Sequence, residues 1–102
     1  MRRERVDVTE FTRPGIYQVE CIETKKFFFG ESEATFFTLR DIYLNMNEGI
    51  CENQELLEDL KKYGIEGFRF WVVFTSVILY NPEYRKRMLE EIKESWDGDL
   101  YF

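Results

Sequence analysis

Two short apolar runs near the start of the chain restrict its fold more than any other feature. The runs GIYQVECI and KFFFG are rich in β-branched and aromatic residues, which favour extended backbone. A few polar residues join them, and a connection this short links antiparallel strands, because parallel strands need a crossover of about a dozen residues or more. We therefore predict strands over residues 15–23 and 26–31, paired as an antiparallel hairpin.

Two helices are predicted after the hairpin. Ser32 is a suitable N-cap for the first helix, which we expect to run to about Glu48. The apolar residues of this helix fill a wide arc at helical spacing, and Arg40 falls inside that arc. Asn53 is expected to cap a second helix over residues 54–63, and the glycine that follows is expected to end it.

A third strand and a last helix complete the predicted order. Residues 68–78 carry apolar side chains at both odd and even positions, which predicts a strand covered on both faces. Asn81 and Pro82 form a typical helix start, and this helix is expected to run to about Trp96. The order β-β-α-α-β-α indicates an α/β or α+β domain, in which helices pack on a small antiparallel sheet.

Length and composition indicate one globular domain. The 102 residues suffice for a single modest core, and a hydrophobic fraction of 44% excludes a disordered chain. We divide the chain into a polar lead-in over residues 1–13, the domain over 14–96 and an aromatic tail over 97–102. No apolar run reaches the roughly 18 residues that span a bilayer, and the first residues lack the apolar stretch of a signal peptide, so no membrane partner is expected.

Charge and residue usage exclude several kinds of chemistry. The chain has no histidine, which removes the commonest general base and metal ligand. Cys21 and Cys51 fit no metal-binding spacing, so we expect two free thiols and an intracellular, reducing location, either cytoplasmic or organellar. The net charge is −6, which does not favour strong binding to nucleic acid.

A set of short motifs in the hairpin and the first two helices carries the functional signal. Residues 15–17 read Gly-Ile-Tyr in the first strand, and residues 28–30 read Phe-Phe-Gly in the second. Arg40 follows on the first helix. The pattern N-x-x-L-x-x-D-x-x-x-Y-G then comprises Asn53, Leu56, Asp59, Tyr63 and Gly64, with Phe68 after it. In this order the motifs resemble those of the GIY-YIG nucleases, over about residues 14–96.

The resemblance implies a fold, a reaction and three site residues. The family fold is a three-stranded antiparallel sheet flanked by about three helices, and the family reaction is hydrolysis of a DNA phosphodiester assisted by a divalent ion, usually Mg²⁺. Tyr17 would be the general base or hydrogen-bond partner of the attacking water, and Arg40 would neutralise charge on the phosphate. A glutamate of the last helix would bind the metal. Among its four glutamates we prefer Glu91, because it lies near the edge of the apolar face.

The sequence departs from the family pattern at several polar positions. Phe28 replaces the second tyrosine and lacks its hydroxyl group. Leu44 and Cys51 stand where the family has polar residues, often histidine, and residues 97–102 offer no counterpart of a late asparagine. Each lost acid or base group lowers the rate by about 10²–10⁴-fold. We therefore expect a catalytically impaired GIY-YIG-like domain that acts as an interaction or accessory subunit.

Two alternatives remain open at this stage. The chain could be an active Mg²⁺-dependent endonuclease that uses Tyr17, Arg40 and Glu91 on DNA. It could also share only the architecture and have an unrelated regulatory role. A protein partner is expected for the impaired domain, and an exposed patch formed by residues 100–102 would suit such a partner unless the tail folds back onto the core.

The environment of Arg40 distinguishes the two main hypotheses. A buried guanidinium without a partner is too costly to persist. In an active enzyme Arg40 would line an open cleft together with Tyr17 and Glu91. In an impaired domain a carboxylate, from Glu31, Glu33 or Glu91, would hold the guanidinium in a closed cleft. We predict the second arrangement.

Overall fold

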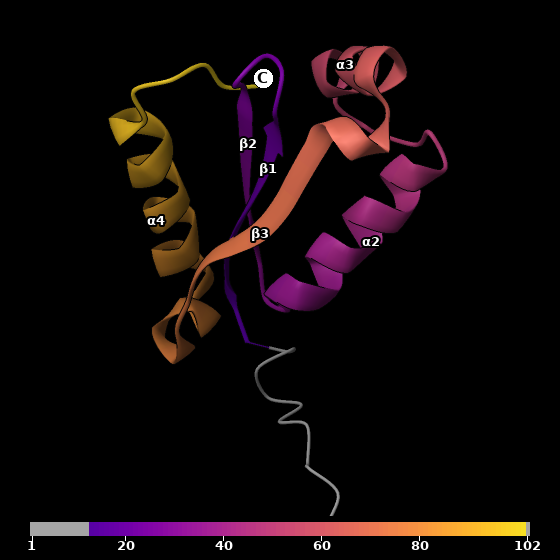
Figure 1. Cartoon of the computed structure of the whole chain (residues 1–102). Coiled ribbons are helices and arrows are strands. Elements are labelled where there is room, and N and C mark those ends of the chain that lie inside the picture. The colour runs from indigo at the N-terminus through magenta and orange to yellow at the C-terminus, as the bar shows by residue number, and fades with distance from the viewer. Residues whose placement is uncertain (1–12, 102) are drawn as a thin grey trace, which may run out of the picture.

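The protein was analysed as a computed structural model, which describes residues 13–101. Within these residues, three strands, three α-helices and two short 3-10 helices follow one another in the predicted order (Figure 1). The elements are β1 (Gly15–Cys21), β2 (Phe27–Ser32), α2 (Thr35–Asn47), α3 (Gln54–Tyr63), η1 (Ile65–Gly67), β3 (Phe68–Thr75), η2 (Val77–Tyr80) and α4 (Pro82–Ser95). The prediction of an α+β domain with order β-β-α-α-β-α is therefore confirmed.

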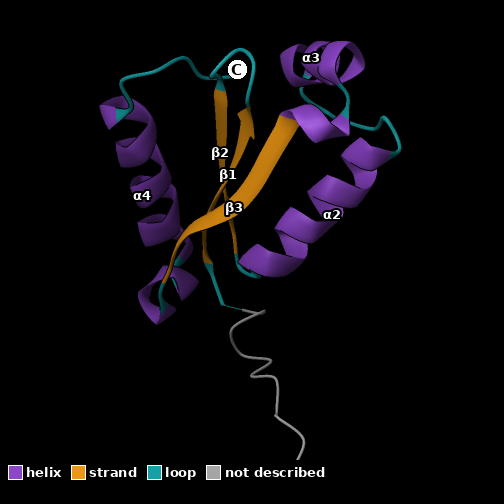
Figure 2. Ribbon diagram, viewed as in Figure 1, coloured by secondary structure: helices purple, strands orange, loops and turns teal. Residues whose placement is uncertain are grey.

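The strands form one antiparallel sheet with helices on both faces. The strand order is β2-β1-β3, and both pairings are antiparallel. Helices α2 and α3 cover one face, and α4 covers the other (Figure 2). The hairpin predicted from the two apolar runs is confirmed, with Tyr17 opposite Gly30 across the β1–β2 pair.

The central strand is β1, and β3 lies at an edge of the sheet. All seven residues of β1 are buried, including the polar residues Gln18 and Glu20. On β3, by contrast, Trp71 and Phe74 keep about two fifths of their surface exposed, at 40% and 44%. The prediction of a third strand covered on both faces is therefore wrong. An edge strand has a neighbour on one side only, so its apolar side chains are less completely covered.

Two predicted boundaries differ from the structure because serine side chains form local turns. Ser32 ends β2, and its hydroxyl accepts a hydrogen bond from the Ala34 N–H at 2.9 Å. The helix expected to start at Ser32 therefore begins at Thr35. Ser76 ends the third strand in the same way, since its hydroxyl accepts from the Ile78 N–H and starts η2. Short polar side chains of this kind favour turns over continued helix or strand.

The main core lies between the sheet and the pair α2 and α3. Its buried members are Tyr17, Val19, Cys21, Leu39, Met46, Leu56, Leu60, Phe68 and Tyr101. Tyr101 belongs to the tail, and its hydroxyl donates to the Asp59 carboxylate at 2.6 Å. Leu100 bridges to Phe27 of β2. Residues 100 and 101 thus fold back onto the domain and do not form the exposed patch considered above; Phe102 and the lead-in residues 1–12 lie outside the described residues.

Helix α2 buries a narrower face than its sequence suggests. Leu39 and Met46 are buried, whereas Phe36, Phe37, Tyr43 and Leu44 are exposed. The wide apolar arc therefore extends beyond the surface that the sheet covers. Among residues 13–101, no helix is long and apolar enough to cross a membrane.

Candidate active site

Tyr17 is held in the core on the face of the sheet that α2 and α3 cover. Its side chain is only 7% exposed, and its ring lies 6.4 Å from that of Phe28, centroid to centroid. Burial raises the pKa of the Tyr17 hydroxyl, and the nearby Glu31 carboxylate raises it further. The shift moves the pKa of this hydroxyl further above neutral pH, away from the range that suits a general base.

The glycine of the Phe-Phe-Gly triplet and the tyrosine of the Gly-Ile-Tyr triplet form one packing unit. A methyl group at Gly30 would overlap the ring and hydroxyl of Tyr17. Glycine at this position lets the cross-strand tyrosine lie flat against the backbone of β2. The Gly-Ile-Tyr and Phe-Phe-Gly motifs therefore have a packing role, in addition to the chemical role that the family resemblance implies.

Arg40 does not occupy the closed cleft predicted for it. Its side chain is 64% exposed, its guanidinium lies 3.5 Å from the Asp41 carboxylate, and it also lies over the ring of Phe37. The prediction that Glu31, Glu33 or Glu91 holds Arg40 is therefore wrong. The physical reason is the narrow buried face of α2: Arg40 belongs to the part of the apolar arc that remains in solvent.

Arg85 is the arginine that the fold buries. It lies on α4 with a side chain 8% exposed, and its Nε donates to the Glu31 carboxylate at 2.9 Å. Its Nη1 donates to the carbonyl oxygen of Leu79 at 3.0 Å. Glu33 lies farther away, at 3.9 Å, and is largely exposed. The acidic partner Glu31 was anticipated from the sequence, but the arginine that it binds was not.

A signal for the burial of Arg85 is present in the sequence. Met88 and Leu89 lie three and four positions later, and residues at these spacings share a helix face. Both are partly buried, as is Ile92 one turn further on. Tyr84, four positions before Met88, has the same spacing but is 46% exposed, so the buried face of α4 is turned toward Arg85.

Glu91 is exposed on α4. That helix covers the face of the sheet opposite to α2 and α3 (Figure 1), whereas Tyr17 belongs to the core on the α2 and α3 side. Glu91 borders a cavity of about 140 Å³ together with Leu79, Arg87 and other residues of η2 and α4. Within residues 13–101 there is no group of three or more Cys, Asp or Glu side chains that could hold a metal ion. The metal-binding role of Glu91 remains a prediction.

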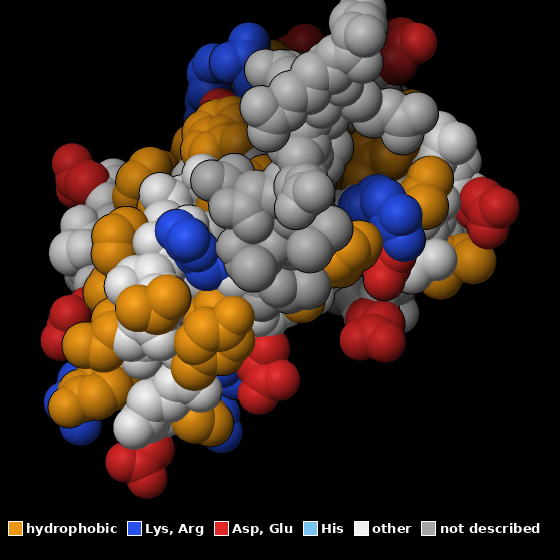
Figure 3. All heavy atoms as spheres, turned by 90° about the horizontal axis from the view of Figure 1, so that it is seen from below, with side chains coloured by type: hydrophobic (Ala, Val, Ile, Leu, Met, Phe, Trp, Pro, Cys, Tyr) orange, Lys and Arg blue, Asp and Glu red, His pale blue; other side chains and the backbone are white. Residues whose placement is uncertain are grey.

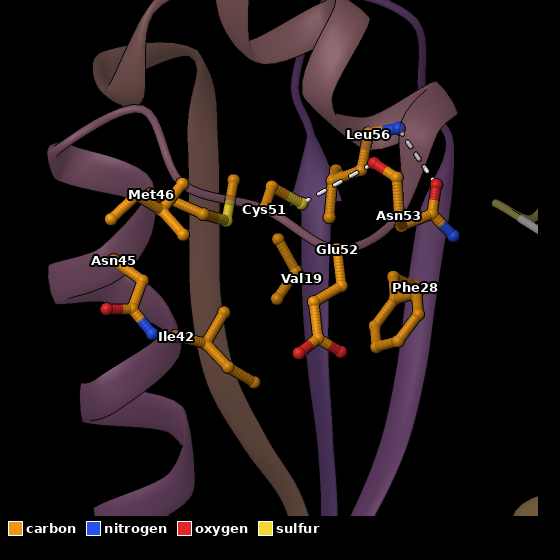
Figure 4. Close-up of a pocket in the computed structure, with 10 residues that line it drawn as sticks. Val19, Phe28, Ile42, Asn45, Met46, Cys51, Glu52, Asn53 and Leu56 are labelled. Atoms are coloured by element: carbon orange, nitrogen blue, oxygen red, sulfur yellow. Dashed lines mark hydrogen bonds between the residues drawn. The ribbon is translucent and has the colours of Figure 1, made fainter.

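A larger cavity of about 260 Å³ opens between the sheet and the pair α2 and α3. Phe28 and Cys51 both line it, so two positions where the resemblance implies polar groups border the same cavity (Figure 4). Cys51 is a free, partly buried thiol, as is the more deeply buried Cys21. Burial raises the pKa of the Cys51 thiol, so this thiol is neutral at neutral pH.

A three-stranded antiparallel sheet with α2 and α3 on one face and α4 on the other defines a GIY-YIG-like nuclease fold. Two solved structures that it resembles are both of the catalytic domain of one enzyme. A mutant catalytic domain of intron endonuclease I-TevI superposes with a TM-score of 0.65 and 19% sequence identity, over 80% of this chain and 82% of that one. The catalytic domain of homing endonuclease I-TevI gives a TM-score of 0.62 and 16% identity, over 86% and 97% of the two chains. No protein-family model and no curated protein matches the sequence.

Proposed function

We propose that this nuclease-type domain is catalytically impaired and acts as an interaction or accessory subunit. The observation that carries the proposal is the separation of the three site residues. Tyr17 is buried on the α2 face of the sheet, Arg40 extends into solvent, and Glu91 lies on α4 over the other face. Metal-assisted hydrolysis requires base, cation and metal ligand around one phosphate.

The chemistry of the individual groups supports the same proposal. The Tyr17 hydroxyl has a raised pKa, and Phe28 beside it has no hydroxyl at all. The arginine that the fold does bury, Arg85, has its guanidinium engaged by Glu31 and by a backbone carbonyl oxygen. A guanidinium held in this way has fewer donors left for a phosphate.

A protein partner is supported by exposed apolar surface. Figure 3 views the molecule from below and shows hydrophobic side chains gathered on the left, the side on which η2 and α4 lie. The large exposed hydrophobic residues of these two elements are Val77, Ile78, Tyr80 and Tyr84. Apolar surface of this kind suits a protein partner better than it suits DNA, and the net charge of −6 also disfavours DNA. The two free thiols favour an intracellular location.

The alternative function is that of an active endonuclease on DNA. The fold favours it, because the two similar structures described above are catalytic domains of an endonuclease. In that case Glu91 would hold Mg²⁺ through its carboxylate, which is the ligand that a hard cation prefers. Arg40, already exposed, would be accessible to a phosphate.

A plasmid-nicking assay separates the two functions. We expect no Mg²⁺-dependent nicking by the native protein above that of an Arg40→Ala variant. The matched pair Glu91→Gln and Glu90→Gln removes the same charge from adjacent positions on α4, and only Glu91 is assigned to metal. Cleavage that needs Mg²⁺, persists in Glu90→Gln and disappears in both Arg40→Ala and Glu91→Gln would establish the enzyme instead.

A second experiment addresses the partner. The native protein and a Val77→Ser, Ile78→Ser double variant are used to purify associated proteins from the native source. Both residues are more than half exposed, at 66% and 56%, so the variant should fold normally. We expect a protein that copurifies with the native chain and is lost with the variant. If the native chain and the variant copurify with the same proteins, the η2 surface is not the docking site.

A further inference from the structure

We propose that the cavity between the sheet, α2 and α3 binds a small amine with an apolar body. The cavity measures about 260 Å³ and is distinct from the surface of η2 and α4 discussed above. An apolar cavity of about 150 Å³ already accepts benzene. The observed volume therefore accommodates one aromatic ring and a short tether carrying a polar group.

The inner walls of the cavity are apolar and come from four elements. Val19 lies on β1, Phe28 on β2, and Ile42 and Met46 on α2 (Figure 4). Leu56, in the first turn of α3, adds a fourth surface. Val19, Met46 and Leu56 are buried and belong to the core, so these walls are rigidly supported. Such walls favour a ring or aliphatic body, because its transfer from water gains the hydrophobic free energy.

The polar side chains around the cavity differ in whether they already have a hydrogen-bond partner. The Cys51 thiol donates to the carbonyl oxygen of Asn53, and the Asn53 side chain accepts from the Leu56 N–H. The thiol and the Asn53 side-chain oxygen are thus already paired, and the side chain of Asn45, which also lines the cavity, is neutral. Glu52 is different: across residues 13–101 its exposed carboxylate has no ion pair and no hydrogen bond. In Figure 4 its side chain runs between Ile42 of α2 and Phe28 of β2.

The negative charge of Glu52 determines which polar group a ligand in this cavity should carry. A carboxylate attracts a cation and repels an anion, and it only accepts hydrogen bonds. No lysine or arginine lines the cavity among the described residues, so nothing there compensates the negative charge. A protonated amine complements this arrangement, with its body against the apolar walls and its ammonium group at Glu52. Covalent attachment to Cys51 is disfavoured, because its thiol is kept neutral by burial.

This binding role goes beyond the proposed function and is independent of it. The nicking assay tests Arg40 and Glu91, and neither residue lines the cavity. A chain that cleaves DNA could still bind the amine, and an inactive chain could fail to bind it. The two proposals therefore succeed or fail on separate measurements.

The test is an NMR titration of the full chain with phenethylamine and with phenethyl alcohol. The two probes have the same ring and tether, and only the amine carries a positive charge. We expect the amine to shift the signals of Val19, Ile42 and Met46, with a dissociation constant on the order of 1 mM, as for other ligands of this size. The alcohol should bind at the same residues but about 3- to 5-fold more weakly, which is the upper end of the contribution of an exposed ion pair.

Two variants with the same charge change provide the control. Glu52→Gln should weaken amine binding about 3- to 5-fold and leave alcohol binding unchanged. Glu48→Gln changes a carboxylate four positions earlier that does not line the cavity, and it should change neither probe. Raising the salt concentration to about 1 M should remove most of the preference for the amine.

Several outcomes would overturn the proposal. Shifts confined to other residues, or none at millimolar probe, would exclude the cavity as the site. Equal affinity for amine and alcohol, or equal effects of Glu52→Gln and Glu48→Gln, would exclude Glu52 as the selecting group. A Cys51→Leu variant, which fills the cavity from its partly exposed wall, should abolish binding. If circular dichroism shows that this variant does not fold, the residues whose NMR signals shift in the native chain still show where the probe binds.

Discussion

Removal of the Arg85 side chain should destabilise the domain strongly, because it breaks a largely buried ion pair between α4 and β2. Arg85 is 8% exposed and its partner Glu31 is 20% exposed, so the ion pair is largely removed from water. Loss of one partner of a buried pair typically costs about 3–5 kcal/mol, because the remaining charge is left without compensation. Since water still reaches Glu31, we expect a smaller loss of about 2–3 kcal/mol for Arg85→Met.

The assay is urea unfolding followed by tryptophan fluorescence. A domain of this size is stable by about 5–15 kcal/mol, so the expected loss is easily measured. It corresponds to a fall in melting temperature of about 10–20 °C. Met keeps much of the apolar stem of Arg85, which isolates the loss of the guanidinium contacts to Glu31 and to the Leu79 carbonyl oxygen.

Two companion variants test whether the ion pair between Arg85 and Glu31 accounts for this loss of stability. Glu33→Gln removes a carboxylate that lies 3.9 Å from the same guanidinium but is 71% exposed, and it should cost less than about 0.5 kcal/mol. The double variant Arg85→Met, Glu31→Leu replaces both charges by apolar groups and should be more stable than Arg85→Met alone. A loss below about 1 kcal/mol for Arg85→Met, or equal losses for Glu33→Gln and Glu31→Gln, would contradict the assignment of a buried pair.

Two further predictions concern tyrosines of the core. Tyr101→Phe removes the hydrogen bond to Asp59 and should cost about 1–2 kcal/mol at pH 7 in the same urea assay. Burial and that hydrogen bond raise the pKa of Tyr101 above its ordinary value of 10, so the native state keeps a proton that the unfolded chain releases. Stability should therefore fall as the pH rises above about 10, less steeply in Tyr101→Phe than in the native chain, and equal slopes would contradict the raised pKa. Gly30→Ala should cost about 1–3 kcal/mol by displacing the Tyr17 ring, seen as a change in near-ultraviolet circular dichroism; an unchanged spectrum would show that the two residues do not pack as described.

Local signals in the sequence predicted most of the fold. Asn53 and Asn81 cap their helices through side-chain oxygens that accept backbone N–H groups, as their positions before helical runs indicated. Gly64 ends α3 with a positive φ of 74°, a conformation that glycine adopts without strain. The hairpin followed from the short polar connection between two apolar runs. These features depend on neighbours a few positions apart, so the sequence contains them directly.

The candidate site was predictable only in part. Tyr17 is placed on β1 as expected, and its packing against Gly30 accounts for both halves of the motif. The separation of Tyr17, Arg40 and Glu91 could not be predicted, because it depends on which face of each helix meets the sheet. The cavity that Phe28 and Cys51 share likewise results from the packing of α2 and α3 on the hairpin.

By itself the sequence determined the order of the elements, their caps and the resemblance to a GIY-YIG domain. Only the tertiary structure decided which arginine is buried. Helical spacing places Arg40 within an apolar arc, but burial depends on how much of that arc a neighbour covers, and on α2 the sheet covers only part of it. Arg85 is buried because folding brings it to Glu31, 54 positions away in the chain. No local pattern encodes a pairing over that distance, since it arises when α4 packs against β2.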